Sequence, residues 1–99
     1  MRARPAPAGL RRLRNLGPTS AAMLAAAGIG SEAELRRLGA VGAYLAVLRS
    51  GQPGNLNLLW TLEGALADRD WRAVARDDRL RLLMELERRR QPEAQADGG

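Results

Sequence analysis

Apolar residues recur every three or four positions along most of this chain, which is the spacing of one face of an α-helix. Glycine, proline and asparagine interrupt the pattern often, so each helical stretch is short. The apolar residues are chiefly alanine and leucine, which are the best helix formers. The pattern therefore predicts an all-α domain, a compact bundle of five to six short helices.

Residues 15–18 separate a first short helix over 10–14 from a second over 18–27. Asparagine and glycine accept positive φ, and Pro18 is suited to the first turn of a helix, so a tight hairpin is expected here. We expect Gly17 to need an unusual φ or a close backbone approach, so that a β-branched residue there would destabilise the domain. Gly28 is suited to the left-handed cap, with Ile29 covering the helix end.

Ser31 begins a third helix through a predicted capping box, in which its hydroxyl accepts from the third helical amide and Glu34 reaches back to the Ser31 amide. Glu32 and Arg36 are spaced to form an ion pair on this helix. Gly39 is predicted to stop it at about residue 38, and apolar residues at helical spacing predict a fourth helix over 41–48.

Asn55 or Asn57 is expected to cap a fifth helix that is apolar around much of its circumference and therefore central and buried. Asp70 can cap a short helix starting at Trp71. Asp77 is expected to open the last helix. The predicted inner stripe of that helix is Leu80, Leu83, Met84 and Leu86.

The composition narrows the possible chemistry. With no cysteine and no histidine, the chain lacks disulfides, thiolate nucleophiles and the usual zinc, haem and iron–sulfur ligands. Ninety-nine residues form one small domain with little room for a deep pocket. We expect no enzyme activity, no cofactor and no metal.

The net charge of +5 is concentrated at the start of the chain, where residues 1–14 hold five arginines and no acid. The other 11 arginines are balanced by the 11 acids. Residues 1–9 are predicted to be a disordered basic arm, 10–90 the helical domain and 91–99 a disordered tail. No secretory signal or membrane-spanning run is evident, so we expect a cytoplasmic protein.

The residues around the hairpin resemble the helix-hairpin-helix motif, which implies a helix-hairpin-helix-like (SAM-domain-like) N-terminal half. More closely, residues 10–86 resemble the C-terminal domain of the TfoX/Sxy family, regulators of bacterial competence for DNA uptake. The resemblance rests on Leu13, Asn15, Leu16, Gly17, Pro18, Ser20, Ala21, Leu24, Ala27, Gly28, Ile29, Leu38, Gly39, Ala40, the run 56–60, the run 62–66, Asp70 and Trp71. It implies a role in transcriptional regulation of competence. Full-length family members carry a further N-terminal domain, and only about a dozen residues precede the match here.

A short internal sequence repeat could indicate a second hairpin that is related to the first by pseudo-symmetry. The pattern Leu-x-x-Leu-Gly-x-x-x-Ala occurs at 13–21 and again at 35–43. Any short amphipathic helix with a glycine cap gives the same pattern, so both interpretations stay open.

Helix-hairpin-helix loops bind DNA by presenting backbone amides at a helix N-terminus to a phosphate. The candidate nucleic-acid-binding residues on this hypothesis are Arg11, Arg12, Arg14, Asn15, Gly17, Thr19 and Ser20. The alternative is that the hairpin serves packing alone. The expected partner is another protein, either a regulator or a second copy of the chain, with nucleic acid as the alternative and no membrane or small-molecule substrate.

Two other groups of residues have both a structural and a functional interpretation. Trp60 and Trp71 could stack on bases, but two tryptophans flanked by leucine are expected to lie in the core. The carboxylates are explained by helix caps and ion pairs. For Glu63, which lies within an apolar helix, the expected partner is Arg69 or Arg72.

Overall fold

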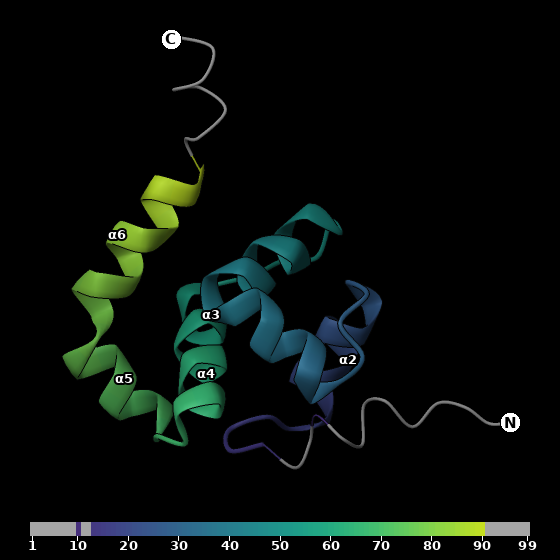
Figure 1. The fold of residues 1–99 in the computed structure, drawn as a ribbon, viewed down its shortest axis with the longest axis horizontal. Helices are drawn as coiled ribbons and strands as arrows, with labels where there is room; N and C mark the ends of the chain where they lie inside the picture. Colours follow the sequence, from purple (N-terminus) through teal and green to yellow (C-terminus); the bar gives the residue numbers. More distant parts are fainter. Residues whose placement is uncertain (1–9, 11–12, 91–99) are drawn as a thin grey trace, which may run out of the picture.

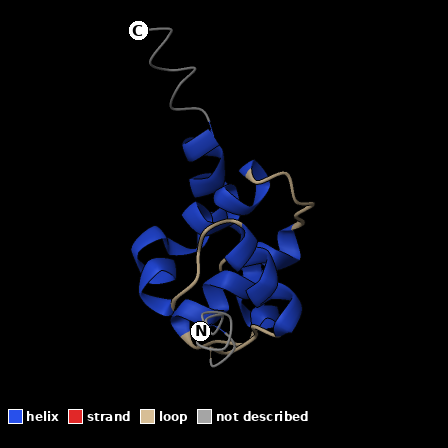
Figure 2. Ribbon diagram, turned by 90° about the vertical axis from the view of Figure 1, so that its right-hand side faces the viewer, coloured by secondary structure: helices blue, strands red, loops and turns tan. Residues whose placement is uncertain are grey.

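The computed structural model describes residue 10 and residues 13–90, and this part of the chain is helical with no strand (Figure 1, Figure 2). Its helices are α2 (Pro18–Ala26), α3 (Glu32–Arg49), α4 (Leu56–Ala67), α5 (Trp71–Asp77) and α6 (Arg79–Arg90). The predicted all-α class is thus confirmed. The predicted arm over 1–9, the tail over 91–99 and part of the first short helix lie outside the described residues.

The hairpin leads into α2, which begins and ends as the sequence predicts. Pro18 occupies the first helical position, after Gly17 as the N-cap. At the other end Gly28 has φ +88°, and the amide of Ile29 donates to the Leu24 carbonyl over 2.8 Å. This is a Schellman cap, and Ile29 is buried over the helix end as expected.

α3 combines the two helices that the sequence predicts on either side of Gly39. Ser31 caps it by accepting from the amide of Glu34 over 3.1 Å, but the Glu34 carboxylate binds Arg37 instead of returning to the Ser31 amide. The Glu32–Arg36 ion pair forms as predicted, at 2.8 Å. Gly39 has φ +77° and kinks the helix at the predicted break.

The two copies of the internal sequence repeat have different backbone conformations. Gly39 has positive φ inside α3, whereas Gly17 is extended, with φ −97° and ψ −173°, before α2. The second half of the pattern is therefore a kinked helix and not a second copy of the hairpin.

α4 lies between α3 and α5 and forms the centre of the core (Figure 1). Asn55 caps it by accepting from the amide of Leu58 over 3.2 Å. Trp60 is 3% exposed, which confirms its predicted place in the core. Trp71 is half-buried against the core, and the Arg72 guanidinium lies over its ring at 4.8 Å from the centroid.

The C-terminal helices differ from the prediction in their boundary and in the face that they bury. Asp70 is the N-cap of α5, although its side chain makes no capping bond. α5 continues through Asp77, so α6 begins at Arg79 and not at Asp77. Leu82 and Leu86 form its buried side together with half-buried Leu83.

Leu80 and Met84, which the sequence analysis assigns to the inner stripe, are instead exposed, at 71% and 62%. Apolar residues occur on several sides of this helix, so periodicity alone could not select the side that packs against the core.

Candidate functional site

The hairpin places its required positive φ at Asn15 and not at Gly17. Asn15 has φ +73°, a conformation that asparagine tolerates better than most residues. The backbone before and after it closes through two short-range bonds, from the Leu13 amide to the Leu10 carbonyl and from the Leu16 amide to the Leu13 carbonyl. Leu10 and Leu16 are buried and anchor the hairpin to the core.

The Asn15 side chain binds a distant loop. Its Nδ2 donates to the carbonyl oxygen of Arg69 over 2.8 Å, and this links the hairpin to the loop between α4 and α5. Gly64 of α4 lies under this bond, because a Cβ on Gly64 would come nearer than 3.0 Å to both bonded atoms. The side-chain amide of Asn15 therefore has a structural function. Position 64 requires glycine because the Asn15 side chain and the Arg69 carbonyl approach its backbone closely.

The expectation for Gly17 is wrong on both grounds. Its backbone is extended, which any residue adopts, and a Cβ added to it would meet no atom within 4 Å. Gly17 is the N-cap of α2, and the space around it is open. The close approach expected at Gly17 occurs at Gly64, where a glycine within an apolar helix was the available sequence signal.

The start of α2 has two features that are compatible with binding an anion. No acidic residue lies in its first turn and no side chain caps it. The first amides of a helix have no intrahelical acceptor, which leaves those of Thr19 and Ser20 available there. Thr19 is exposed, and so is Arg14, whose Nη1 lies 3.4 Å from the carbonyl oxygen of Asp68. Arg11 and Arg12 lie outside the described residues.

Ser20 lines an open depression of about 450 Å³ between α2 and α4. The other lining residues include Met23, Pro53, Gly54, Asn57 and Thr61. Gln52, in the loop after α3, donates to the carbonyl of the lining residue Met23 over 2.9 Å. No lining residue is ionisable, so the depression offers hydroxyl, amide and apolar groups only.

Carboxylates and arginines form a network where α4, α5 and α6 meet. Glu63 binds Arg81 at 3.0 Å, which corrects the expected pairing with Arg69 or Arg72. Arg69 instead binds Asp78 at 2.5 Å and Asp77 at 3.2 Å, and Arg81 also reaches Asp78 at 3.4 Å. The network therefore fixes the start of α6 against α4 and the preceding loop.

Hydrogen bonding shifts the pKa values of two members of this network, and Arg76 joins it through a 3.0 Å ion pair with Asp77. The pKa of Asp77 is lowered, mainly by the hydrogen bond from Arg76, and the pKa of Arg81 is raised, mainly by its hydrogen bond to Glu63. Both shifts favour the charged forms, which is the behaviour of a structural ion-pair network.

Within residue 10 and residues 13–90, no group of three or more acidic, histidine or cysteine side chains is placed to hold a metal ion. In the same part of the chain, no helix has the length and apolar character needed to cross a membrane.

The chain matches a known protein family. The family model described as the TfoX C-terminal domain matches residues 6–86 of the chain. Neither the comparison with curated proteins nor the comparison with solved structures gave a match. The matched range spans the hairpin, the Gly64 contact and most of α6.

Proposed function

Because the chain belongs to the TfoX C-terminal domain family, we propose that it is a non-catalytic regulatory module in the transcriptional control of competence, acting through contact with another protein. The family match carries this proposal, since it covers the whole core from before the hairpin to Leu86. Two large apolar residues on α6, Leu80 and Met84, are exposed, and this supports contact with a protein. Covering such side chains with a partner removes apolar surface from water, which favours binding.

A genetic experiment tests the regulatory role. In the bacterium that encodes the chain, deletion of its coding sequence should lower both the transformation frequency and the transcript levels of DNA-uptake genes. Complementation with the parent and with a Gly42→Ala variant should restore both. An unchanged transformation frequency in the deletion strain under competence-inducing conditions would refute the proposal.

Weak, non-specific nucleic-acid binding through the hairpin and the arginine arm is the second candidate. The observation that favours it is the start of α2, which has no acidic residue in its first turn and no side-chain cap, with the exposed Arg14 four residues before Pro18 along the chain. The commitment of the Asn15 amide to Arg69 counts against it, because that side chain is not available to a phosphate.

An electrophoretic titration with duplex DNA at two salt concentrations separates the two candidates. Each phosphate contact changes the slope of log affinity against log salt by about 0.9. Neutralising Arg11, Arg12 and Arg14 together should therefore lower the slope by up to about 3 if all three bind phosphates. An Arg49→Gln variant is the control, since this exposed arginine lies at the far end of α3. For a protein-binding module we expect negligible DNA binding by the parent at physiological salt.

A further inference from the structure

The outer side of α6 is apolar at its centre, although the helix already buries its opposite side. Leu80 and Met84 are one helical turn apart and so lie in one stripe, and among the described residues they are the exposed large hydrophobic side chains. Leu82 and Leu86 bury the inner side, at 1% and 5% exposure. A helix that packs on one side alone is expected to be polar on the other, so this second apolar stripe has no function within the described fold.

The charges on α6 indicate which kind of partner would cover this stripe. The helix carries five arginines and two glutamates, a net charge of +3. Arg88 follows Met84 by one turn and continues the same stripe, and three of the five arginines lie in the last turn. One of the glutamates, Glu85, is engaged by Arg89 at 3.6 Å. The stripe formed by Leu80, Met84 and Arg88 is therefore apolar over its first two positions and basic at its C-terminal end, with Glu87 beside it.

We propose that this outer stripe of α6, formed by Leu80, Met84 and Arg88, is a docking surface for an acidic amphipathic helix of a partner protein. The inference rests on the proposed regulatory function and specifies its partner. A leucine ridge on such a helix would cover the apolar pair, and its carboxylates would reach the arginines, as in other helix-to-helix recognition. A second copy of the chain fits less well, because pairing α6 with itself brings together two helices that each carry a charge of +3.

Duplex DNA fits less well for a different reason. Phosphate contacts come from charged and polar groups, and two large apolar side chains at the centre of the surface make no such contact. The apolar centre with a basic end is instead the arrangement expected of a protein interface with an apolar core and a polar rim.

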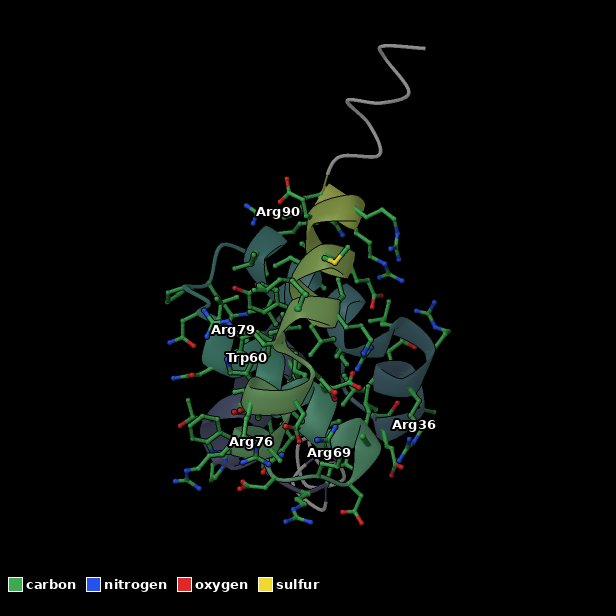
Figure 3. All side chains as sticks on the ribbon, turned by 90° about the vertical axis from the view of Figure 1, so that its left-hand side faces the viewer. Arg36, Trp60, Arg69, Arg76, Arg79 and Arg90 are labelled. Carbon is green, nitrogen blue, oxygen red and sulfur yellow. The ribbon has the colours of Figure 1, made fainter. Side chains whose placement is uncertain are left out.

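The fold holds this surface in a fixed position. Arg81 binds Glu63 of α4 and Asp78, and Asp78 in turn binds Arg69, so the first turn of α6 is tied to the core. Figure 3 shows α6 crossing the face toward the viewer, with Arg79 near its start and Arg90 at its far end. A partner helix would meet a surface whose orientation is already set, which lowers the ordering cost of binding.

The test uses two labelled synthetic helical peptides that share one leucine ridge and differ only in their flanking positions, glutamate in one and lysine in the other. Fluorescence anisotropy with the full chain should show binding of the glutamate peptide and binding at least about tenfold weaker of the lysine peptide. The double variant Leu80→Ser/Met84→Ser should weaken the glutamate peptide by at least about tenfold.

Charge reversal at one position provides the matched comparison. Arg88→Glu should weaken the glutamate peptide and strengthen the lysine peptide. Arg49→Glu is the control, because Arg49 likewise lies in the last turn of a helix but belongs to α3 and not to the proposed surface. It should leave the binding of both peptides unchanged. Circular dichroism should show parent-like folding for every variant, since each replaced side chain is exposed.

Four outcomes would overturn the proposal. Equal binding of both peptides would remove the acidic requirement, and binding unaffected by the serine variant would remove the apolar stripe. A dimer in sedimentation analysis that the serine variant abolishes would assign the surface to a second copy. Binding to duplex DNA or to anionic vesicles that Arg88→Glu abolishes and the serine variant spares would make it a phosphate-binding surface.

The transformation assay separates failure of this inference from failure of the proposed function. If deletion lowers transformation and the serine variant restores it fully, the regulatory role stands and the docking surface is refuted. If deletion has no effect, the regulatory role is refuted, and the peptide measurements then decide the docking surface alone.

Discussion

Replacing Gly64 with alanine tests the contact that joins the hairpin to the loop after α4. The added Cβ would come nearer than 3.0 Å to both the Asn15 Nδ2 and the Arg69 carbonyl oxygen, one of which is backbone, so the hairpin and the loop must separate. Forcing an extra carbon into a packed site costs about 1–3 kcal/mol. Loss of the Asn15–Arg69 hydrogen bond adds about 0.5–1.5 kcal/mol.

Alanine also favours the helix by about 1 kcal/mol over glycine, which offsets part of that loss. The expected net destabilisation is therefore about 0.5–3.5 kcal/mol, with about 2 kcal/mol at the middle of the range. For a domain of this size each 1 kcal/mol lowers the melting midpoint by about 4–8 °C, so a loss of about 2 kcal/mol should lower it by about 8–16 °C in a thermal melt followed by circular dichroism.

Gly42→Ala is the matched control, since Gly42 also lies within a helix. A Cβ there would meet the Arg89 Nη1 at 3.0 Å, and that atom ends a flexible side chain that can move away. Its melting midpoint should stay the same or rise through the helix preference of alanine. In a double-mutant cycle, Asn15→Ala should make Gly64→Ala less costly, because the crowded donor is gone. Equal midpoints for Gly64→Ala and the parent would refute the close approach.

The remaining predictions use chemical or thermal unfolding. Trp60→Ala should cost about 3–5 kcal/mol, because the ring is 3% exposed in the core, and a well-folded variant would contradict that placement. Leu82→Ala should cost about 2–5 kcal/mol while Leu80→Ala stays within about 0.5 kcal/mol, and the reverse order would restore the inner stripe predicted from the sequence. Because the pKa of Asp77 is lowered in the fold, its carboxylate stabilises the folded state above its ordinary pKa of 3.8, and this stabilisation is lost as the pH falls below that value. Asp77→Asn should therefore make the melting midpoint less sensitive to acid, and an unchanged dependence of the midpoint on pH would contradict this.

Local signals predicted most of the helix boundaries. The Ser31 and Asn55 caps, the Gly28 cap with Ile29 and the break at Gly39 each depend on residues within a few positions along the chain, and all four are present in the structure. Propensity and capping act at short range, so the sequence contains the information needed to place them.

The errors concern interactions between distant residues. Asn15 binds a carbonyl 54 residues away, and Glu63 binds an arginine 18 residues away, so neither partner can be inferred from spacing on one helix. The buried side of α6 depends on how the helix packs against the rest of the core, and the apolar residues on several of its sides left that choice open in the sequence. Tertiary packing decided each of these cases.

The same contacts determine which candidate residues remain available for binding. In the hairpin, the Asn15 side chain is committed to the carbonyl of Arg69 and is not available to an anion at the start of α2. Phosphate binding there would depend on backbone amides and on arginine side chains, so it would weaken as the salt concentration rises. On α6 the apolar side chains of Leu80 and Met84 are exposed, and the free energy of covering them is not screened by salt. We therefore expect binding to the proposed docking surface on α6 to weaken less than binding at the hairpin as the salt concentration increases.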